Sequence, residues 1–411
     1  MTPQIKQRLD QIQRGEVPKG YKRTRAGVIP NEWEIHPLSK HLTESRIPGT
    51  NGAVAKKLTV KLWNKGVYEK REVHEGSEST SYYKRKSGQL IYSKLDFLNC
   101  AFGIIPEHLD GYESTQDLPC FDIFGVDPFY LLTYVTQRNF YTHFGMIADG
   151  GRKARRVGPE DMLSFPLVYP PLPEQQKIAE ILSAEDKLIA LKEKLIEEKK
   201  RQKKALMQQL LTGKKRLLGY SDEWKPTKLK KLLKERKTYS QKGLEYPHVT
   251  LSTDGIYAKT ERYDREHLVK SEDKEYKITH KGDICYNPAN LKFGVICVNT
   301  FGDAIFSPIY VTFEVQKGVD LGFLSNYLMR WDFINAVRKY EEGTVYERMA
   351  VKPEDFLKFE IKLPSIEEQK AISKILSLYD SEIELLKNDL YQEKQKKKAL
   401  MQLLLTGIVR V

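Results

Sequence analysis

The sequence predicts an α+β protein in which two mixed α/β domains are joined by two long α-helices. The helices are expected to pair as an antiparallel coiled coil with a pseudo-two-fold internal repeat. Three observations lead to this prediction. One block of sequence recurs after a shift of 194 residues. Each copy of this block carries an apolar stripe with helical spacing. The block that precedes each copy carries short strand-like runs.

The internal repeat is clearest at the end of each copy. Residues 204–213 read KALMQQLLTG and residues 398–407 read KALMQLLLTG. The shift holds without a gap over residues 175–213 and 369–407, where 19 of 39 positions are identical. Two motifs recur further upstream: Pro-Glu-Asp at 159–161 and 353–355, and Glu-Trp at 32–33 and 223–224. The chain therefore holds two copies of one unit.

The well-matched block of each copy is predicted to be a long helix. Pro173 near its start and Ser365 three residues before Glu368, as in a capping box, are typical of helix N-termini. A 39-residue helix is about 58 Å long, so its apolar stripe needs a comparable helix beside it. The predicted pairing residues are Ile178, Ile181, Leu182, Leu188, Ile189, Leu195, Ile196, Leu206 and Leu210 in copy one, and Ile372, Ile375, Leu376, Ile383, Leu386, Leu390, Leu400 and Leu404 in copy two.

The variable blocks are predicted to be compact mixed α/β domains. They contain short apolar runs, such as GQLIYSKL and IYVTFEV, bounded by turn residues. Before the first block, a short helix through Ile5, Leu9 and Ile12 leads into a basic loop, GYKRTRAG, and this segment is expected to pack on a helix pair. The expected organisation is an N-terminal segment (1–30), a first domain (31–170), a central helix (171–215), a second domain (220–364) and a C-terminal helix (365–411).

Charge and cysteine usage narrow the class of protein. Lys and Arg total 68 against 55 for Asp and Glu, a net charge of +13, which favours a polyanionic partner such as nucleic acid. The four cysteines form no Cys-x-x-Cys pair, and no apolar segment begins the chain. We therefore expect a cytoplasmic protein without structural zinc and without a membrane span.

Candidate catalytic motifs are weak. Residues 287–290, Asn-Pro-Ala-Asn, partly match the Asn-Pro-Pro-aromatic motif of adenine methyltransferases but lack the aromatic that would stack on a flipped base. Asp355 with Glu360 and Lys362 is a superficial nuclease match, better explained as a strand leaving the domain. His36 and His41 lack metal-site spacing, and no phosphate-binding loop is present. We expect no catalytic residue and no metal ligand.

Basic segments punctuated by glycine are better candidates for contacts with DNA phosphates or guanine edges. The alternative for each is an ordinary basic surface loop. The candidates are Tyr83, Lys84, Arg85, Lys86, Arg152, Lys153, Arg155 and Arg156 in copy one, and Arg262, Arg265, Lys292, Tyr346 and Arg348 in copy two. Because the loops of the two copies differ, they favour two unequal half-sites.

The order of these motifs resembles the specificity subunits of type I restriction-modification enzymes. The resemblance covers essentially the whole chain, through the two Glu-Trp block starts, the two Pro-Glu-Asp exits, the helix starts EQQKIAEIL and EEQKAISKIL, and the paired KALMQxLLTG ends. It implies two target-recognition domains, each reading one half of a bipartite double-stranded DNA site, with the helices as a ruler between them.

The same resemblance implies a non-catalytic chain that binds no cofactor of its own. Two methyltransferase subunits would bind S-adenosylmethionine, and two restriction and translocase subunits would use ATP and Mg²⁺. The competing hypothesis is a helical scaffold that spaces two protein-binding domains, with incidental basic charge. Salt dependence separates the two hypotheses, since a protein that neutralises DNA phosphates loses affinity steeply as salt rises.

Overall fold

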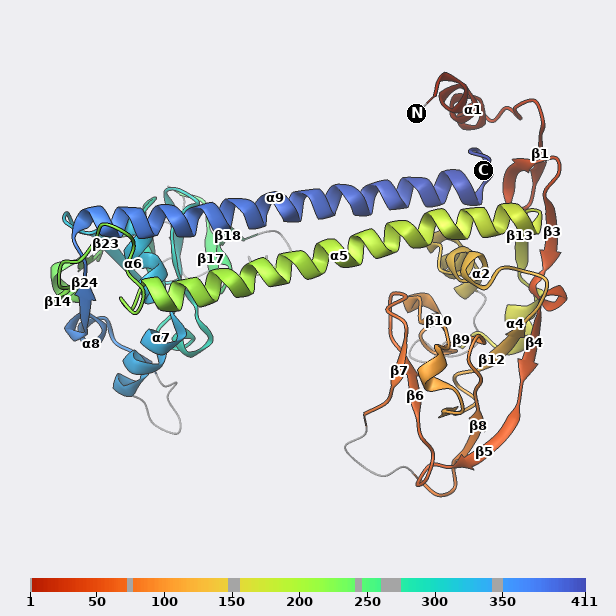
Figure 1. Ribbon diagram of the computed structural model, residues 1–411, viewed down its shortest axis with the longest axis horizontal. Helices are drawn as coiled ribbons and strands as arrows, with labels where there is room; N and C mark the ends of the chain where they lie inside the picture. Colours follow the sequence, from red (N-terminus) through yellow and green to blue (C-terminus); the bar gives the residue numbers. More distant parts are fainter. Residues whose placement is uncertain (1, 72–76, 147–155, 241–245, 260–274, 342–349) are drawn as a thin grey trace. The chain divides into compact units, whose positions relative to one another are not determined.

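The computed structural model describes residues 2–71, 77–146, 156–240, 246–259, 275–341 and 350–411. The chain divides into two compact units. Unit 1 comprises Met1–Leu191 and Leu390–Val411, and unit 2 comprises Lys192–Asp389. Each unit contains one mixed α/β domain and segments of two long helices, so the predicted α+β class is confirmed (Figure 1).

The two long helices are α5 (Leu172–Leu210) and α9 (Ile366–Leu405), and each contributes residues to both units. The other helices of unit 1 are α1 (Pro3–Gln13), α2 (Pro128–Val135), α3 (Arg138–Gly145) and α4 (Pro159–Ser164). Its strands are β1 (Tyr21–Thr24), β2 (Gly27–Pro30), β3 (Glu34–Pro37), β4 (Leu42–Ser45), β5 (Ile47–Asn51), β6 (Leu58–Val60), β7 (Val67–Glu69), β8 (Ser81–Lys84), β9 (Leu90–Tyr92), β10 (Phe102–Ile104), β11 (Glu113–Ser114), β12 (Cys120–Ile123) and β13 (Pro166–Tyr169).

Unit 2 repeats this order of elements. Its helices are α6 (Leu321–Leu328), α7 (Trp331–Val337) and α8 (Pro353–Lys358), beside its parts of α5 and α9. Its strands are β14 (Lys225–Lys228), β15 (Leu233–Glu235), β16 (Tyr239–Ser240), β17 (Val249–Ser252), β18 (Gly255–Ala258), β19 (Tyr276–Thr279), β20 (Ile284–Tyr286), β21 (Ile296–Val298), β22 (Ala304–Phe306), β23 (Val311–Val315) and β24 (Glu360–Leu363).

Ion pairs show that the helix segments run antiparallel within each unit. In unit 2, Lys192 binds Asp389 and Lys203 binds Asp380, each with an N···O distance of 2.6 Å. Residue numbers therefore rise along α5 while they fall along α9. In unit 1, Arg410 after α9 binds Glu174 near the start of α5 at 2.6 Å, and Lys396 binds Glu185 at 2.9 Å, which gives the same direction.

Of the seventeen predicted pairing residues, fifteen are buried or half-buried, and many of these belong to or pack against a domain core. Ile178, Leu182 and Leu404 belong to the core of unit 1, while Leu210, Ile372 and Leu376 belong to that of unit 2. Ile196 and Ile383 are buried along the shafts. Ile181, Leu206, Ile375 and Leu400 pack at the edges of the cores, and Ile189, Leu386 and Leu390 are half-buried.

The prediction was wrong for Leu188 and Leu195, which are 38% and 42% exposed. Each directly precedes an isoleucine of the seam, Ile189 or Ile196. Successive helical residues lie about 100° apart around the axis, so the two neighbours face different directions, and here the leucine is the one that points to solvent. The isoleucines are therefore less exposed than the leucines that precede them.

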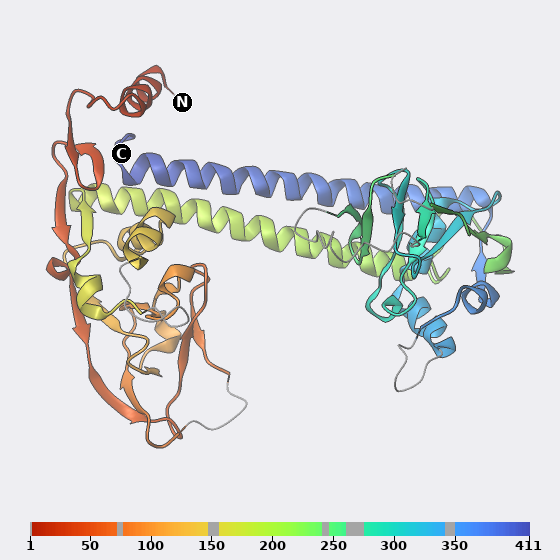
Figure 2. The ribbon, with the colours of Figure 1, turned by 180° about the vertical axis from the view of Figure 1, so that it is seen from behind.

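The domain of unit 1 is built on two small antiparallel sheets. One has the strand order β10-β9-β12-β4 and the other β11-β8-β5, while β13 pairs with β3 where the domain meets α5. The core contains Leu90, Tyr92 and Phe121 from the first sheet and Tyr130 from α2. In Figures 1 and 2, α2 lies beside the first turns of α5, where the backbone N–H of Asp127 donates to the Gln175 side chain at 3.0 Å.

The N-terminal basic segment is a hairpin rather than the predicted loop. Strands β1 and β2 pair from Tyr21–Pro30 to Thr24–Gly27. The N-terminal segment packs on the end of α9, in agreement with the prediction that it packs on a helix pair. The Tyr21 hydroxyl donates to the Gly407 carbonyl at 2.8 Å, and Arg8 donates to the Ile408 carbonyl at 2.9 Å.

Unit 2 reproduces these sheets in the register of the repeat. Its sheets have the orders β15-β23-β20-β21 and β16-β19-β22, and β14 pairs with β24 as β3 pairs with β13. Strands β9 and β20 are related by the 194-residue shift, as are β10 and β21. The Tyr92 hydroxyl donates to the Val157 carbonyl and the Tyr286 hydroxyl to the Val351 carbonyl, again 194 residues apart. The duplication is therefore present in the fold.

A buried carboxylate joins the domain of unit 1 to its helices. Glu174, 7% exposed near the start of α5, accepts a hydrogen bond from the Trp33 indole at 2.9 Å. Its other partner is the Arg410 guanidinium, whose Nε and Nη2 atoms lie 2.6 and 3.0 Å from its two oxygens. The side-chain hydrogen bonds to Glu174 raise the pKa of Arg410 above its usual range. We call this cluster the Trp–Glu–Arg joint.

Unit 2 has the same joint. Glu368, 1% exposed, accepts from the Trp224 indole at 3.3 Å and from Arg216 through two bonds of 2.8 Å. Glu368 and Glu174 are 194 residues apart, as are Arg216 and Arg410. Ser365 caps α9 by accepting from the Glu368 backbone N–H at 3.3 Å, but the Glu368 side chain serves the joint instead of completing the predicted capping box.

We predict that the two joints stabilise their units separately. The substitution Arg410→Ala leaves the buried Glu174 carboxylate with one donor, which should cost unit 1 about 1–3 kcal/mol. Hydrogen exchange should therefore accelerate in β3 and β13 but not in β14 and β24. Arg216→Ala should do the reverse. Equal acceleration in both units would contradict independent joints.

Candidate nucleic-acid interface

Strand β8 carries the first group of predicted contact residues in unit 1. It lies between β5 and β11, with Tyr83 opposite Pro48 and Lys84 opposite Ile47. Lys84 is exposed and Tyr83 is half-buried. Lys86 is exposed in the following turn, where Gly88 has a φ of +81°, a left-handed conformation that glycine adopts without strain. Tyr83, Lys84 and Lys86 therefore lie close together and reach the surface.

Arg85 does not belong to this surface. Its side chain is 2% exposed and donates to the Ser114 hydroxyl at 2.8 Å and to the carbonyls of Ser45 and Leu118 at 2.9 and 3.0 Å. Burial lowers the pKa of its guanidinium. Arg85 therefore ties β8 to two neighbouring segments, and its prediction as a DNA contact was wrong. A basic run in the sequence cannot distinguish an inward cation from its outward neighbours.

The second basic segment of copy one is only partly described. Arg156 is exposed, and its Nε atom lies 3.7 Å from a carboxylate oxygen of Asp117. Such an exposed pair contributes little to stability, so Arg156 can exchange its carboxylate partner for a phosphate. Arg152, Lys153 and Arg155 lie outside the described residues.

A cationic position at the end of the first domain strand was missed by the sequence reasoning. Arg46 follows β4, is 69% exposed, and pairs with Glu44 at 2.8 Å. The equivalent residue in unit 2 is Lys237, which follows β15, is 64% exposed, and pairs with Glu235 at 3.3 Å. Counting from Trp33 and Trp224 aligns Arg46 with Lys237, so the repeat itself held the signal.

The turn before the central strand supplies a second repeated cation. In unit 2, Lys281 is exposed in the turn that leads into β20, and Gly282 has a φ of +94°. This turn is equivalent to the turn that carries Lys86 and Gly88 in unit 1. Lys281 was also missed. Each unit thus presents one cation after its first domain strand and another in this turn.

The other predicted residues of copy two are less informative. Lys292 is half-buried, with its ammonium 5.2 Å from the centre of the exposed Phe293 ring. It remains a candidate at the edge of the domain. Arg262, Arg265, Tyr346 and Arg348 lie outside the described residues.

The described residues do not assemble a catalytic or metal site. Burial raises the pKa of Cys100, Cys120 and Cys285 to about 12 and that of Cys297 to about 11, so these thiols stay protonated. Within the described ranges, no three His, Cys, Asp or Glu side chains are placed to hold a metal ion. A cavity of about 560 Å³ beside α3 is lined by Arg25 and His143 but by no described carboxylate or thiol.

The weak motifs of the sequence have structural roles. The Asn287 side chain accepts from the backbone N–H groups of Ala289 and Asn290 at 3.1 and 3.3 Å, which closes a turn. Asp355 pairs with Lys358 along α8, and Glu360 is exposed on β24.

No helix among the described residues is long and apolar enough to span a membrane.

His36 and His41 form a buried polar pair at the base of the unit 1 domain. Their Nδ1 and Nε2 atoms are 2.9 Å apart, and both rings stack on Tyr169. His36 also contacts Glu34 at 2.6 Å and Lys40 at 3.0 Å. Burial is the main cause that lowers the pKa of His41, so the ring is held neutral. The pair is a structural contact between β3, β13 and the start of β4.

Two repeated domains, each on an antiparallel helix pair and with exposed cations in equivalent segments, define a duplicated protein with a candidate nucleic-acid interface on each domain. The family model described as "Type I restriction modification DNA specificity domain" matches residues 127–201 and 221–393. The chain belongs to this family and is a specificity subunit of a type I restriction-modification system, as its motifs predicted.

Individual relatives agree with this assignment. The putative type I restriction enzyme MjaX specificity subunit of Methanocaldococcus jannaschii is 26% identical, over 96% of this chain and 97% of its own. The MjaVIII specificity subunit of the same organism is 28% identical, over 59% of this chain and 61% of its own.

Two solved structures share the fold. A chain from work on complex assembly and conformational transition of the type I R-M system has a TM-score of 0.56 at 15% identity and covers 93% of this chain and 99% of its own. The crystal structure of the Type-I restriction-modification system S subunit from M. genitalium has a TM-score of 0.52 at 12% identity, over 90% of this chain and 96% of its own.

We predict that unit 1 loses stability at mildly acidic pH. The pKa of His41 lies below its usual 6.5 in the folded protein, so the unfolded chain binds more protons below that pH. The stabilisation is complete above about pH 6.5 and decreases as the pH falls toward the folded-state pKa. Hydrogen exchange at about pH 7.5 and about pH 5.5, corrected for intrinsic rates, should show lower protection of β3 and β13 at the acidic pH.

The control for this prediction lies within the molecule. Thr227 and Leu232 occupy the positions of His36 and His41 in unit 2. Strands β14 and β24 should therefore keep their protection over the same pH range. A matching loss in these strands would show that the His pair is not the cause.

Proposed function

We propose that this specificity subunit reads a bipartite double-stranded DNA site, one half with each domain. The observation that carries the proposal is the repetition of exposed cations in equivalent segments: Arg46 and Lys237 after the first domain strand, and Lys86 and Lys281, one position apart in the register of the repeat, in the turn before the central strand. Cations at these positions suit contacts to phosphates, which fix the orientation of a protein on DNA. The paired helices would set the spacing of the half-sites.

Sequence readout within each half-site would come from parts that differ between the domains. In unit 1 the hairpin of β6 and β7 has a long tip in which Trp63 is 56% exposed. Trp63 and Asn64 have φ values of +61° and +52°, an uncommon conformation for residues other than glycine. In unit 2 the equivalent hairpin of β17 and β18 turns through Thr253 and Asp254 alone. Such different tips support unequal half-sites.

The subunit would recruit the enzymatic parts of the system rather than act itself. We propose that two methyltransferase subunits, with S-adenosylmethionine, and two restriction and translocase subunits, with ATP and Mg²⁺, assemble on it. Apolar side chains exposed on the long helices offer a protein-binding surface. They are Leu191, Leu378, Leu385 and Tyr391, between 59% and 70% exposed. The same side chains favour the competing hypothesis of a helical scaffold, which DNA binding distinguishes.

We predict that three exposed cations of unit 1 contact phosphates. In a complex with the methyltransferase subunit, the triple substitution Arg46→Ala, Lys84→Ala and Lys86→Ala should weaken binding to target DNA. The slope of log affinity against log salt should fall by about 2–3, because each lost phosphate contact removes about 0.9. Fluorescence anisotropy at several salt concentrations measures both quantities.

The matched control removes three exposed lysines from the long helices, Lys187, Lys194 and Lys204, which changes the net charge equally. Its affinity should stay near that of the natural protein. If both triple variants bind alike, the cations of unit 1 do not form a DNA interface, and the scaffold hypothesis gains support.

We also predict that residues 1–217 form a homodimer that substitutes for the full chain. This fragment contains Trp33 and Glu174 but lacks Arg410, and Arg216 of a second copy can complete the joint because it occupies the equivalent position. The dimer should select a palindromic site built from the first half-site. Light scattering and selection from random duplexes, with the methyltransferase subunit present, test both claims.

Arg216→Ala in the fragment provides the control, since it should weaken the dimer without touching the domain of unit 1. A fragment that folds but stays monomeric at micromolar concentration would contradict the interchange of the two copies. Selection of a non-palindromic site by a dimer would contradict it too.

A further inference from the structure

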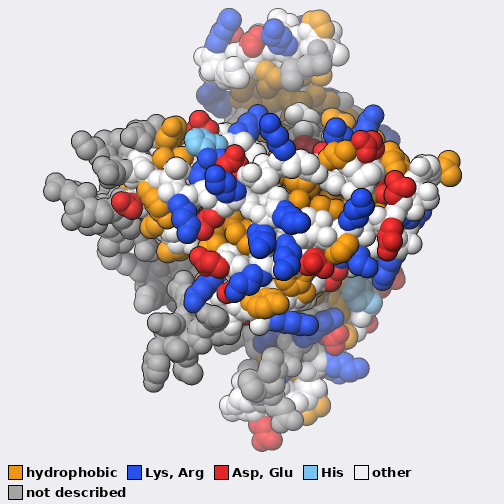
Figure 3. All heavy atoms as spheres, turned by 90° about the vertical axis from the view of Figure 1, so that its left-hand side faces the viewer, with side chains coloured by type: hydrophobic (Ala, Val, Ile, Leu, Met, Phe, Trp, Pro, Cys, Tyr) orange, Lys and Arg blue, Asp and Glu red, His pale blue; other side chains and the backbone are white. Residues whose placement is uncertain are grey.

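Five exposed lysines lie within ten residues at the start of the unit 2 domain. Lys225 and Lys228 lie on β14, Lys230 and Lys231 on the short turn that follows it, and Lys234 on β15. All five are exposed, and none has an ion pair to a described carboxylate. We call these five residues the lysine face. Figure 3 shows Lys and Arg side chains, interspersed with Asp, Glu and hydrophobic side chains, on the face of unit 2 that includes β14, β24 and α8.

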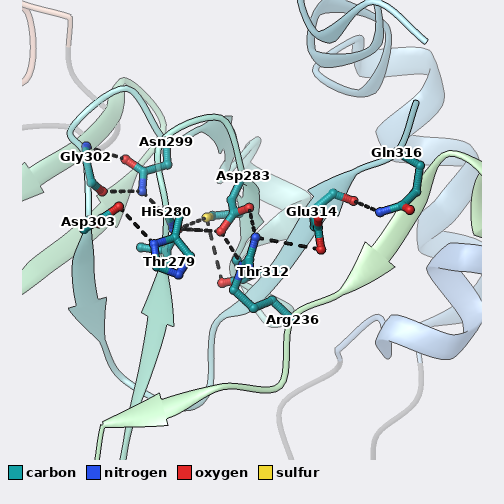
Figure 4. A network of polar contacts seen from close by, with 11 residues as sticks. Arg236, Thr279, His280, Asp283, Asn299, Gly302, Asp303, Thr312, Glu314 and Gln316 are labelled. Atoms are coloured by element: carbon teal, nitrogen blue, oxygen red, sulfur yellow. Dashed lines mark hydrogen bonds and ion pairs between the residues drawn. The ribbon is translucent and has the colours of Figure 1, made fainter. Parts of the chain in front are cut away.

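The backbone beneath the lysine face is held at both ends by buried polar contacts. At its start, Trp224 donates to Glu368 in the joint. At its end, Arg236 donates through Nε and Nη2 to the two oxygens of Asp283 at 2.9 and 3.0 Å (Figure 4). Asp283 is 3% exposed and also accepts from the His280 backbone N–H at 2.8 Å. The lysines are therefore presented on a fixed support.

The residues between the lysines complete this support. Leu229, Leu232 and Leu233 are buried in the core of unit 2. From residue 224 to residue 237, no large hydrophobic side chain is exposed. Lysine is depleted at the centres of protein–protein interfaces, whereas exposed ammonium groups suit the phosphates of DNA. The lysine face is therefore better suited to bind a polyanion than a protein surface.

Unit 1 has no counterpart of the lysine face. The equivalent segment, residues 34–43, contains one lysine, Lys40, and one glutamate, Glu34. Lys40 is already bonded to His36 at 3.0 Å. The lysine face is therefore not among the features that the two domains share, and a contact made by it exists on the side of unit 2 alone.

We propose that the lysine face binds the phosphates of duplex DNA flanking the second half-site, outside the recognised bases. The inference rests on the proposed function. The half-site itself is assigned to the positions that recur in both domains, Lys237 and Lys281 in unit 2. The lysine face precedes these positions in the chain and lies on strands that join the domain to its helices, so it adds affinity on one flank without adding sequence information.

The test uses the full chain in complex with its methyltransferase subunit, on duplexes that carry the site mapped from methylated DNA. The duplexes have flanks of about 15 base pairs on both sides, or are trimmed to the half-site on one side. The variant replaces the five lysines of the lysine face by glutamine. The control replaces five exposed helix lysines in the same way: Lys187, Lys194, Lys204, Lys374 and Lys398.

The natural complex should lose affinity, about tenfold or more at low salt, and salt dependence when the flank beside the second half-site is trimmed. Trimming the other flank should change neither. The glutamine variant should bind the full duplex as the natural complex binds the trimmed one, and should not respond to trimming. The control should behave as the natural complex does.

Three results would overturn the proposal: unchanged affinity of the glutamine variant on the full duplex, an equal loss in the control, or a loss that persists on the trimmed duplex. The last result would assign the lysines to the half-site. If the natural complex does not discriminate its site from random DNA, the proposed function itself fails, which is a separate outcome.

Discussion

The structure depends on how each domain is fixed to its helix pair, and one buried carboxylate in each unit does this. Glu174 and Glu368 are nearly inaccessible to water, so each needs its indole and guanidinium donors to offset the cost of desolvation. The three side chains come from the domain entrance, the start of one long helix and the segment after the other. A single cluster therefore sets the position at which a domain leaves its helices.

In both units the arginine of this cluster comes from the segment that follows a long helix. In unit 2 the arginine follows α5 directly, but in unit 1 it comes from the last residues of the chain, after α9. Gly407 has a φ of +68°, and a Cβ atom there would approach the Pro30 ring to 2.5 Å. The glycine thus lets the end of α9 pass against the N-terminal hairpin, and the two ends of the sequence belong to one unit.

The helical spacing of apolar residues and the 194-residue repeat predicted the fold well, because both can be read directly from the sequence. The long helices, the duplicated sheets and the Thr-Gly helix ends follow from the sequence alone. The choice between Leu188 and Ile189, or between Leu195 and Ile196, does not, because two adjacent apolar residues satisfy the same pattern and only packing decides between them. The β1–β2 hairpin was missed since its alternation is short and strongly charged.

The candidate interface was less predictable, because a charged residue in the sequence does not show whether its side chain points into the core or to solvent. Arg85 lies in a basic run of copy one yet is buried by carbonyl oxygens from two segments, while Arg46 stands alone in the sequence and is exposed. Aligning the two copies recovers Arg46 through Lys237, and no single-copy pattern does.

Comparison of the two copies also separates features that both domains share from features that occur in one domain. In a duplicated recognition protein, specificity must reside in the features that differ. In the proposed bipartite readout, what the domains share would orient DNA, since it would be the same for both half-sites. The tip at Trp63, the lysine face and the Arg236–Asp283 contact occur in one copy each. On the proposed function, exchanging one domain would change one half-site, because the joints and helices that hold the domains would not depend on what either domain reads.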